Sequence, residues 1–370
     1  MTVDMVTDHN RDMDVTGHTS LGGPSDPGPE PRRAASIRDV AQAAGVSYQT
    51  VSRVINSHPN VREETRKRVE AAIETLGFRR NATAFALASG VTRSVTVLTS
   101  NTTLYGYAAT LQGLEEAARA AGYSLGVKLL TPEDDLDRTI SSAAADGGGG
   151  LMVIGFDRLA ASALDRIPEN VPCAAVVEAP SHGRTPPRPA VWADDREAAR
   201  AATAHLLELG HRTVHYVAIP TSVGTRRSEG PRAQGWRAAL EAAGITPPEP
   251  HGGKGWDARV GYDEGRELAR DPEVTAILCG NDDLALGVLR ALHHAGRPVP
   301  GDVSVIGFDD APHAEFVTPS LTTVRMDFQG LGRDAFALLR GRLENGYRPP
   351  APTFAGTALI LRESAGPTDA

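Results

Sequence analysis

The sequence predicts a small all-α domain at the N-terminus, followed by a larger α/β body. Helical patterns with short turns fill residues 36–90, whereas strand-like and helical runs alternate from Ser94 onward. Alternation of this kind is typical of parallel sheets covered by helices on both faces. A body of about 270 residues exceeds one comfortable hydrophobic core, so we expect it to contain two such units.

Composition excludes several classes of protein. The 370 residues are 41% hydrophobic and contain only two cysteines, Cys173 and Cys279, too few for a disulfide scaffold or a Cys-rich zinc module. No apolar run is long enough to cross a membrane, and residues 1–10 lack the pattern of a secretory signal. We therefore expect a soluble cytoplasmic protein without a membrane partner. No sequence pattern indicates a cofactor, a metal site or a catalytic set, so we do not expect an enzyme.

The net charge of −8 hides an asymmetry. Residues 1–31 carry a net charge of −5, residues 32–90 carry +5, and the remaining 280 residues carry −8. A basic module joined to an acidic body suggests a DNA-binding domain, although charge alone leaves open an ordinary solvated helix face. Residues 1–35 are rich in Asp, Gly and Pro, and we expect a disordered tail there.

The first helix is predicted to begin after Ser36. Asp39 follows three residues later, which resembles a capping box. Val40, Ala43 and Ala44 are expected to form its apolar face.

A second helix follows the tight turn Ala44–Val46, with Ser47 as its cap, and runs from Tyr48 to about Asn56. At about 100° per residue, its apolar and polar side chains separate onto two faces. The apolar face consists of Val51, Val54 and Ile55. The polar arc consists of Tyr48, Gln49, Ser52, Arg53 and Asn56. A third helix is predicted from about Glu63 to Leu76, ending at Gly77.

Two short helices with a glycine turn, the second bearing Gln49 and Arg53, predict a helix-turn-helix. An arginine can donate two hydrogen bonds to guanine, and a glutamine can pair similarly with adenine. The alternative is a solvated helix face on a small three-helix domain.

The body is predicted to alternate strands and helices. Strands are expected at Val95–Thr99, Ser124–Leu129, Leu151–Ile154, Ala174–Val177, Val214–Ile219, Ala276–Leu278 and Val303–Phe308. Helices are expected at Leu111–Ala121, Glu133–Ala145, Ala160–Ile167, Glu197–Leu209, Ala233–Ala243, Tyr262–Ala269 and Leu284–Ala295.

The stretch Ser36–Asn56, continued by Val61–Val69, closely resembles the DNA-binding head of the LacI/GalR family of bacterial transcriptional regulators. The similarity extends to about Arg362. It implies a head at residues 36–80 in which Tyr48, Gln49 and Arg53 read bases. The DNA contacts expected on the second helix and its cap are Ser47, Tyr48, Gln49, Ser52, Arg53 and Asn56.

The resemblance also implies a hinge helix at residues 81–92 that enters the minor groove of the operator. Asn81, Ala84 and Leu87 match hinge contacts, and Leu87 matches the residue that wedges between base steps and kinks the duplex. The alternative is a linker whose Leu87 merely packs on the body.

By the same resemblance, residues 93–362 form two Rossmann-like subdomains, similar to a periplasmic binding protein, that clamp a small effector. The N-subdomain is expected at about 93–193 and 328–350, the C-subdomain at about 194–327 and 351–362, and a tail at 363–370.

The residues implied to bind the effector combine a planar donor, a carboxylate and apolar rings. Arg232 matches an arginine that donates two hydrogen bonds to sugar hydroxyls. Trp256 matches an aromatic residue that stacks on a pyranose ring, and Asp309 matches a carboxylate that accepts a hydrogen bond from a hydroxyl. The full set is Ser100, Leu104, Arg232, Trp256, Asn281, Asp309 and Phe328. Asn281 as a helix cap and Asp309 as a loop residue are the structural alternatives.

The expected function is a repressor of carbohydrate-utilisation genes that a sugar effector releases from operator DNA. The alternative is a co-repressed regulator that responds to a purine or another small metabolite. A transport-associated solute binder and an enzyme on the same scaffold are weaker alternatives. No leucine heptad follows the body, so we expect no helix that joins two dimers into a tetramer. We therefore expect a homodimer, which binds a pseudo-palindromic operator because a two-fold symmetric protein suits a two-fold symmetric site.

Overall fold

A computed structural model describes residues 35–55, 60–78, 93–147, 149–180, 186, 188–222, 230–345 and 354–368. The chain divides after Ala82 into a head and a body, which are described separately. Most of the expected tail, Asn56 and the hinge with Asn81, Ala84 and Leu87 lie outside the described residues.

The head consists of three helices, α1 (Ile37–Ala44), α2 (Tyr48–Ile55) and α3 (Glu63–Leu76). The predicted capping box is confirmed: the Ser36 hydroxyl accepts from the Asp39 backbone N–H, and the Asp39 carboxylate accepts from the Ser36 N–H. Gly45 and Gly77 end α1 and α3 with φ values of 63° and 60°, a region that favours glycine.

The core of the head corrects one detail of the predicted faces. Ala43 is exposed, whereas Ala41 is buried beside Val40 and Ala44. The reason is helical phase: partly buried Ile37 lies about 60° and Ala44 about 40° from Val40 in the same direction, so the centre of the buried face is nearer to Ala41, at about 100°, than to Ala43, at about −60°. The whole buried cluster is Val40, Ala41, Ala44, Val51, Val54, Val69 and Ala72.

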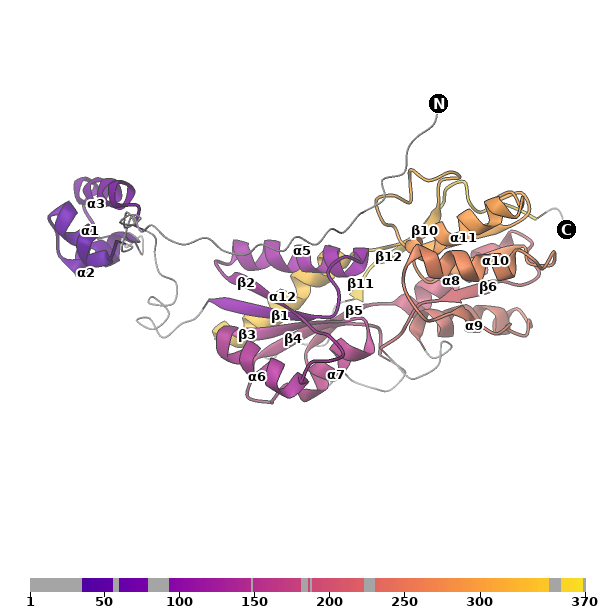
Figure 1. Ribbon diagram of the computed structural model, residues 1–370, viewed down its shortest axis with the longest axis horizontal. Helices are drawn as coiled ribbons and strands as arrows, with labels where there is room; N and C mark the ends of the chain where they lie inside the picture. Colours follow the sequence, from indigo (N-terminus) through magenta and orange to yellow (C-terminus); the bar gives the residue numbers. More distant parts are fainter. Residues whose placement is uncertain are drawn as a thin grey trace, which may run out of the picture. The chain divides into compact units, whose positions relative to one another are not determined.

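The body contains two lobes, each built on a six-stranded sheet (Figure 1). The first sheet is parallel throughout, in the order β11-β5-β4-β3-β1-β2. Its strands are β1 (Ser94–Thr99), β2 (Ser124–Leu129), β3 (Gly150–Gly155), β4 (Cys173–Val177), β5 (Ala190–Ala193) and β11 (Phe354–Ala355). Its helices are α5 (Tyr105–Ala120), α6 (Leu136–Gly147), α7 (Arg158–Arg166) and α12 (Phe328–Asn345).

The second sheet has the order β12-β10-β9-β8-β6-β7, and only its edge strand β12 runs antiparallel to its neighbour. Its strands are β6 (His215–Ala218), β7 (His251–Gly252), β8 (Ala276–Cys279), β9 (Ser304–Asp309), β10 (Thr322–Met326) and β12 (Thr357–Ile360). Its helices are α8 (Asp195–Glu208), α9 (Pro231–Ala242), α10 (Ala258–Leu268) and α11 (Asp282–His294). Each strand and helix predicted for the body is therefore present.

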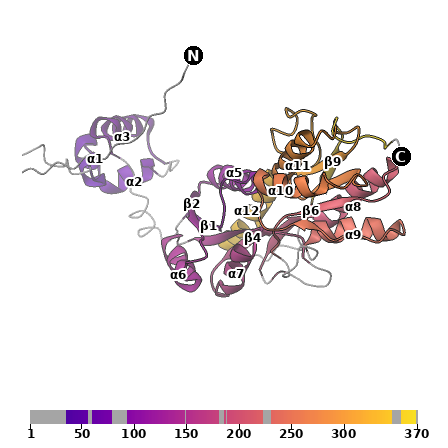
Figure 2. The same ribbon diagram turned by 45° about the vertical axis from the view of Figure 1, so that its right-hand side comes forward.

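The chain crosses between the lobes three times, from β5 to α8, from β10 to α12 and from β11 to β12. Figure 2 shows the two lobes from a second direction, with β1 and β4 in one and β6 and β9 in the other. Because the sheets are parallel, the carboxyl ends of most strands in both lobes face the region of the crossings. This arrangement places the loops that follow the strands around one shared cavity.

Two details differ from the expected boundaries. Strand β11 pairs with β5, so residues 354–355 belong to the first sheet rather than to the second. The expected tail also packs on the second lobe: the buried Ser364 hydroxyl donates to the Val305 carbonyl at 2.6 Å and accepts from the Thr322 N–H at 2.8 Å. Among the described helices, none is long and apolar enough to span a membrane.

Candidate effector pocket and DNA-binding face

Helix α2 presents a polar face to solvent. Tyr48, Gln49 and Arg53 are exposed, whereas Val51 and Val54 are buried, as the helical phase predicts. The cap at the start of this helix is also confirmed, since the Ser47 hydroxyl accepts from the Thr50 N–H at 3.2 Å. Ser52 is partly buried on the same face. Their contacts with DNA, and that of Asn56, stay predictions.

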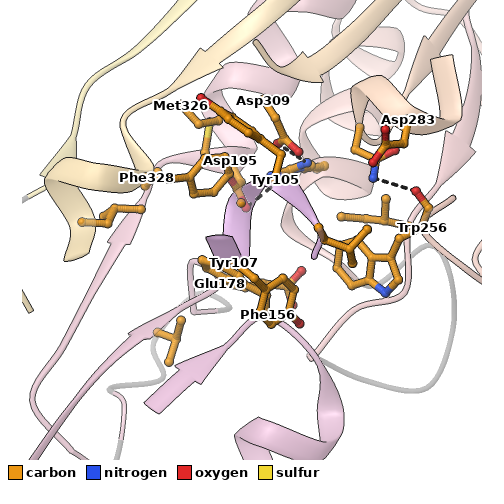
Figure 3. A pocket seen from close by; sticks show the side chains of 18 residues that line it. Tyr105, Tyr107, Phe156, Glu178, Asp195, Trp256, Asp283, Asp309, Met326 and Phe328 are labelled. Carbon is orange, nitrogen blue, oxygen red and sulfur yellow. Dashed lines mark hydrogen bonds and ion pairs between the residues drawn. The ribbon is translucent and has the colours of Figure 1, made fainter. Parts of the chain in front are cut away.

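The body holds a pocket of about 560 Å³, including its open mouth, between the two lobes (Figure 3). Its walls are Leu104, Tyr105, Gly106, Tyr107, Phe156, Val177, Glu178, Ala193, Asp195, Ile219, Arg232, Trp256, Asn281, Asp283, Asp309, Met326, Phe328 and Leu331. Six of the seven predicted effector residues are among them. The exception is Ser100, which donates a hydrogen bond to Asp157.

Arg232 lies at the centre of a buried ionic cluster. Its Nε lies 3.6 Å from Asp195 Oδ2, and its guanidinium nitrogen Nη1 lies 3.2 Å from Asp309 Oδ1. Nη1 also donates to the Gly280 carbonyl, and the guanidinium lies 3.9 Å from the centre of the Phe308 ring. Because both carboxylates hold the guanidinium, its planar donor edge is fixed before any ligand binds.

Asp309 reaches this cluster through an unusual backbone conformation. Its φ is 109°, and φ of the following Asp310 is 55°, both in the region that L-residues rarely adopt. Two ion pairs of 2.7 Å, to Arg325 and Arg362, hold the Asp310 carboxylate. Conformational strain that neighbouring contacts maintain in this way is typical of functional sites.

Burial raises the pKa of Asp309 well above its usual value, although Arg232 opposes the shift. Burial likewise raises the pKa of Asp195, again against the lowering effect of Arg232. Both carboxylates are thus costly to keep ionised without the guanidinium between them.

Aromatic rings form the other side of the pocket. Tyr107 stands edge-on to Phe156 and to Trp256, with ring centres 5.1 and 6.3 Å apart. Phe328 makes similar contacts with Phe156 at 5.9 Å and with Tyr105 at 6.0 Å. Five of the chain's eighteen Phe, Tyr and Trp side chains therefore gather in this one pocket, where they offer apolar faces to a ring-shaped ligand.

A carboxylate fixes one of these rings. Asp157 caps α7 by accepting from the Leu159 and Ala160 N–H groups, and its other oxygen accepts from the Tyr107 hydroxyl at 2.5 Å. Burial, followed by the nearby Asp157, raises the pKa of Tyr107. Tyr107 therefore stays a neutral hydrogen-bond donor to Asp157.

Both the oxygen and the nitrogen of the Asn281 side-chain amide form hydrogen bonds. Its oxygen accepts from the Leu284 N–H at 2.8 Å and caps α11, and its nitrogen donates to the Trp256 carbonyl at 2.9 Å. The capping alternative is thus observed, while contact with a ligand stays a prediction. The second contact also ties α11 to the loop that carries Trp256.

Three pocket carboxylates are not among the predicted site residues, and one of them, Asp283, lies in the first turn of α11. Glu178 follows β4, and Asp195 begins α8 directly after the crossing from β5. A signal for Glu178 was available, since a carboxylate directly after a buried parallel strand is well placed for binding. Asp195 is hidden because acids are common in the first turn of any helix.

The described residues contain no group of three or more His, Cys, Asp or Glu side chains arranged to hold a metal ion. The chemistry that this pocket offers is therefore that of a fixed guanidinium, buried carboxylates and aromatic faces. Such a set can exchange hydrogen bonds with hydroxyl groups while the rings cover an apolar ligand face.

Models of known protein families match both the head and the body of the chain. Residues 36–81 match the model for bacterial regulatory proteins of the lacI family, and residues 203–365 match a periplasmic binding protein-like domain. The HTH-type transcriptional repressor PurR of Pectobacterium carotovorum is 33% identical over 338 residues, covering 89% of this chain and 96% of its own length. The lactose operon repressor of Escherichia coli is 31% identical over 336 residues, covering 90% and 91%.

A solved structure extends the likeness to three dimensions. The lac repressor dimer bound to operator and the anti-inducer ONPF superposes with a TM-score of 0.79 at 28% identity, covering 90% of this chain and all of that one. The sequence of the head, the two-lobed body and the extent of these matches lead to one conclusion: the chain belongs to the lacI family of bacterial transcriptional regulators, which bind DNA.

Proposed function

We propose that this chain is a repressor of carbohydrate-utilisation genes that a small sugar, bound between the two lobes, releases from its operator. The observation that carries the proposal is the pairing of Arg232, held by Asp195 and Asp309, with the aromatic wall around Trp256. Sugar hydroxyls both donate and accept hydrogen bonds, so they suit a guanidinium beside carboxylates. The C–H face of a pyranose suits an aromatic ring.

The pocket joins effector binding to the relative orientation of the lobes. Arg232, Trp256 and Asp309 belong to the second lobe, whereas Tyr107 and Phe328 belong to helices of the first. A ligand that contacts both sets favours one arrangement of the lobes over another. We propose that residues 81–92 carry this change to the head at residues 36–80, with a coupling of about 1–3 kcal/mol.

We further propose that the active form is a homodimer on a pseudo-palindromic operator, in the cytoplasm where its target DNA lies. The lac repressor in the similar structure is a dimer bound to operator, which supports this expectation. We propose that the pocket binds its ligand without converting it chemically, which is the role of an effector site in a regulator.

A second candidate is co-repression by a purine or a similar heterocycle. The aromatic wall favours it, because a flat base can also pack against rings such as Trp256 and Phe328. The two candidates differ in the direction of the response, since a co-repressor tightens operator binding and an inducer weakens it.

The test begins by selecting DNA sites for the purified full chain from a random library, then measures binding to the selected site by fluorescence anisotropy at two salt concentrations. Galactosides, other sugars and purines are added in turn. We expect one sugar to release the specific complex. Tighter binding with a purine would favour the second candidate, and failure to select any specific site would overturn both.

A further inference from the structure

The pocket between the lobes carries an excess of negative charge. Its described lining contains four carboxylates and a single cation, Arg232. The carboxylates are Glu178, Asp195, Asp283 and Asp309. Within the described lining, the guanidinium is thus the only cationic side chain that could attract an anion.

This one cation is already paired with two carboxylates, although its Nε has no hydrogen-bond partner among the described residues. Asp195 and Asp309 flank the Arg232 guanidinium, and the Gly280 carbonyl accepts from it. An anionic ligand that sought the guanidinium would have to displace a carboxylate or approach it closely. Both are unfavourable where burial weakens solvent screening.

Two buried pocket oxygens lack a hydrogen-bond partner among the described residues. One of them, Asp309 Oδ1, lies 3.2 Å from Arg232 Nη1, and the other needs a donor. Asp195 is 6% exposed, and its Oδ1 has no hydrogen-bond partner among the described residues. A buried acceptor without a partner costs free energy, which a donating ligand recovers. A hydroxyl group can donate to this oxygen, whereas an ionised phosphate or carboxylate cannot.

Glu178 and Asp283 complete the set of four carboxylates. Glu178 accepts hydrogen bonds from the Thr221 and Ser222 hydroxyls and from the Ser222 N–H. Burial raises the pKa of Glu178 to about 7, so its charge at neutral pH is partial. Asp283 is a half-buried member of the lining that lies 3.8 Å from His313 on its other side.

We propose that this pocket binds an uncharged sugar or glycoside and rejects the phosphorylated or carboxylated form of the same sugar. This inference rests on the proposed function and specifies its ligand class. The regulator then responds to the substrate of a phosphorylating enzyme and not to its product. The ligand phosphate and the pocket carboxylates repel each other strongly at short distance. We therefore expect the phosphate to lower the affinity for the sugar by about 100-fold or more.

The test compares matched pairs of ligands on the full chain by tryptophan fluorescence, because Trp256 lines the pocket. The pairs are galactose and glucose with their 6-phosphates, galactose with galacturonate, and guanosine with its 5′-monophosphate. We expect the uncharged member to bind more tightly in every pair that binds. The same signal should be lost in Trp256→Phe, which locates the response in the pocket.

A pair of variants separates local from overall charge. Asp283→Asn removes one pocket charge, and Asp263→Asn removes one from the exposed surface of α10. We expect Asp283→Asn to narrow the gap between neutral and phosphorylated ligands by about threefold to tenfold, and Asp263→Asn to leave it unchanged.

The outcomes distinguish this inference from the proposed function. The protein could bind a nucleoside more tightly than its monophosphate and bind no sugar. This result would support the preference for uncharged ligands, which we call the charge rule, and would overturn the sugar response. Equal or tighter binding of a sugar phosphate would overturn the charge rule and leave a sugar-responsive repressor. Failure of every uncharged member to bind would overturn the inference as well.

Discussion

The carboxylate of Glu178, which follows β4 in the first lobe, accepts a hydrogen bond of 2.6 Å from the backbone N–H of Ser222, which follows β6 in the second. The Ser222 and Thr221 hydroxyls donate to the same oxygen. One buried side chain thus ties the two lobes together at the wall of the pocket. A movement of the lobes that separates Glu178 from Ser222 must therefore break this contact.

Glu178 should also make the stability of the body depend on pH. Burial raises its pKa to about 7, so the folded state holds a proton that the unfolded state releases near the ordinary value for glutamate. The free energy of unfolding therefore falls as the pH rises from about 5 to 8, by roughly 1–3 kcal/mol for this group. Asp282, whose pKa burial also raises to about 7, acts in the same direction.

Urea denaturation between pH 5 and pH 8 checks this dependence. Glu178→Gln should flatten the slope, and Glu115→Gln, on the exposed face of α5, should not. An unchanged slope in Glu178→Gln would mean that other groups carry the pH dependence.

The exposed face of α2 predicts a separation of DNA affinity from stability. Arg53→Ala should weaken binding to the selected operator by about 1–3 kcal/mol, because a bidentate contact with a base is lost. Lys67→Ala removes the same charge from the exposed side of α3, and its smaller effect should be equal on specific and random DNA. Both variants should melt like the parent protein. Anisotropy that shows Arg53→Ala binding as tightly as the parent would remove Arg53 from the base-reading residues.

A close helix contact supports the first lobe. A Cβ atom at Gly113 of α5 would lie 2.1 Å from the backbone oxygen of Gln329 in α12, which leaves no room for a side chain. Gly113→Ala should therefore destabilise the body by about 1–3 kcal/mol or more, as overpacking does. Gly126→Ala in β2 is the matched control, since its nearest neighbour would be 3.8 Å away. Thermal melts should separate the two variants, and equal melting temperatures would contradict the contact.

The predictable part of the fold follows from strong periodic signals. The glycine stops, the capping box at Ser36 and the long alternation of the body lead to the correct elements in the correct order. Strands β5, β7 and β10–β12 and helix α12 are not among the predicted elements. The strands are only two to five residues long, too short for a period to emerge. Helix α12 does carry a helical signal, in Phe328, Leu331, Ala335 and Leu339, all buried.

The candidate site also contains residues that could be predicted from the sequence and contacts that could not. Arg232, Trp256 and Asp309 were predicted by resemblance, and the structure brings all three to one pocket. The contacts of Arg232 with Asp195, and of Asp157 with Tyr107, join residues that are far apart in sequence, and no local pattern reports such a pairing.

If a sugar held at Arg232 controls operator binding, a change at the guanidinium must change the sugar concentration that releases the operator. Operator affinity is measured by anisotropy against increasing sugar for the parent protein and for Arg232→Lys, which keeps the charge but loses the planar fork between Asp195 and Asp309. Without sugar, we expect both proteins to bind the operator with equal affinity, and we expect Arg232→Lys to be released only at a sugar concentration about 10-fold or more higher. Release of both proteins at the same sugar concentration would contradict this expectation.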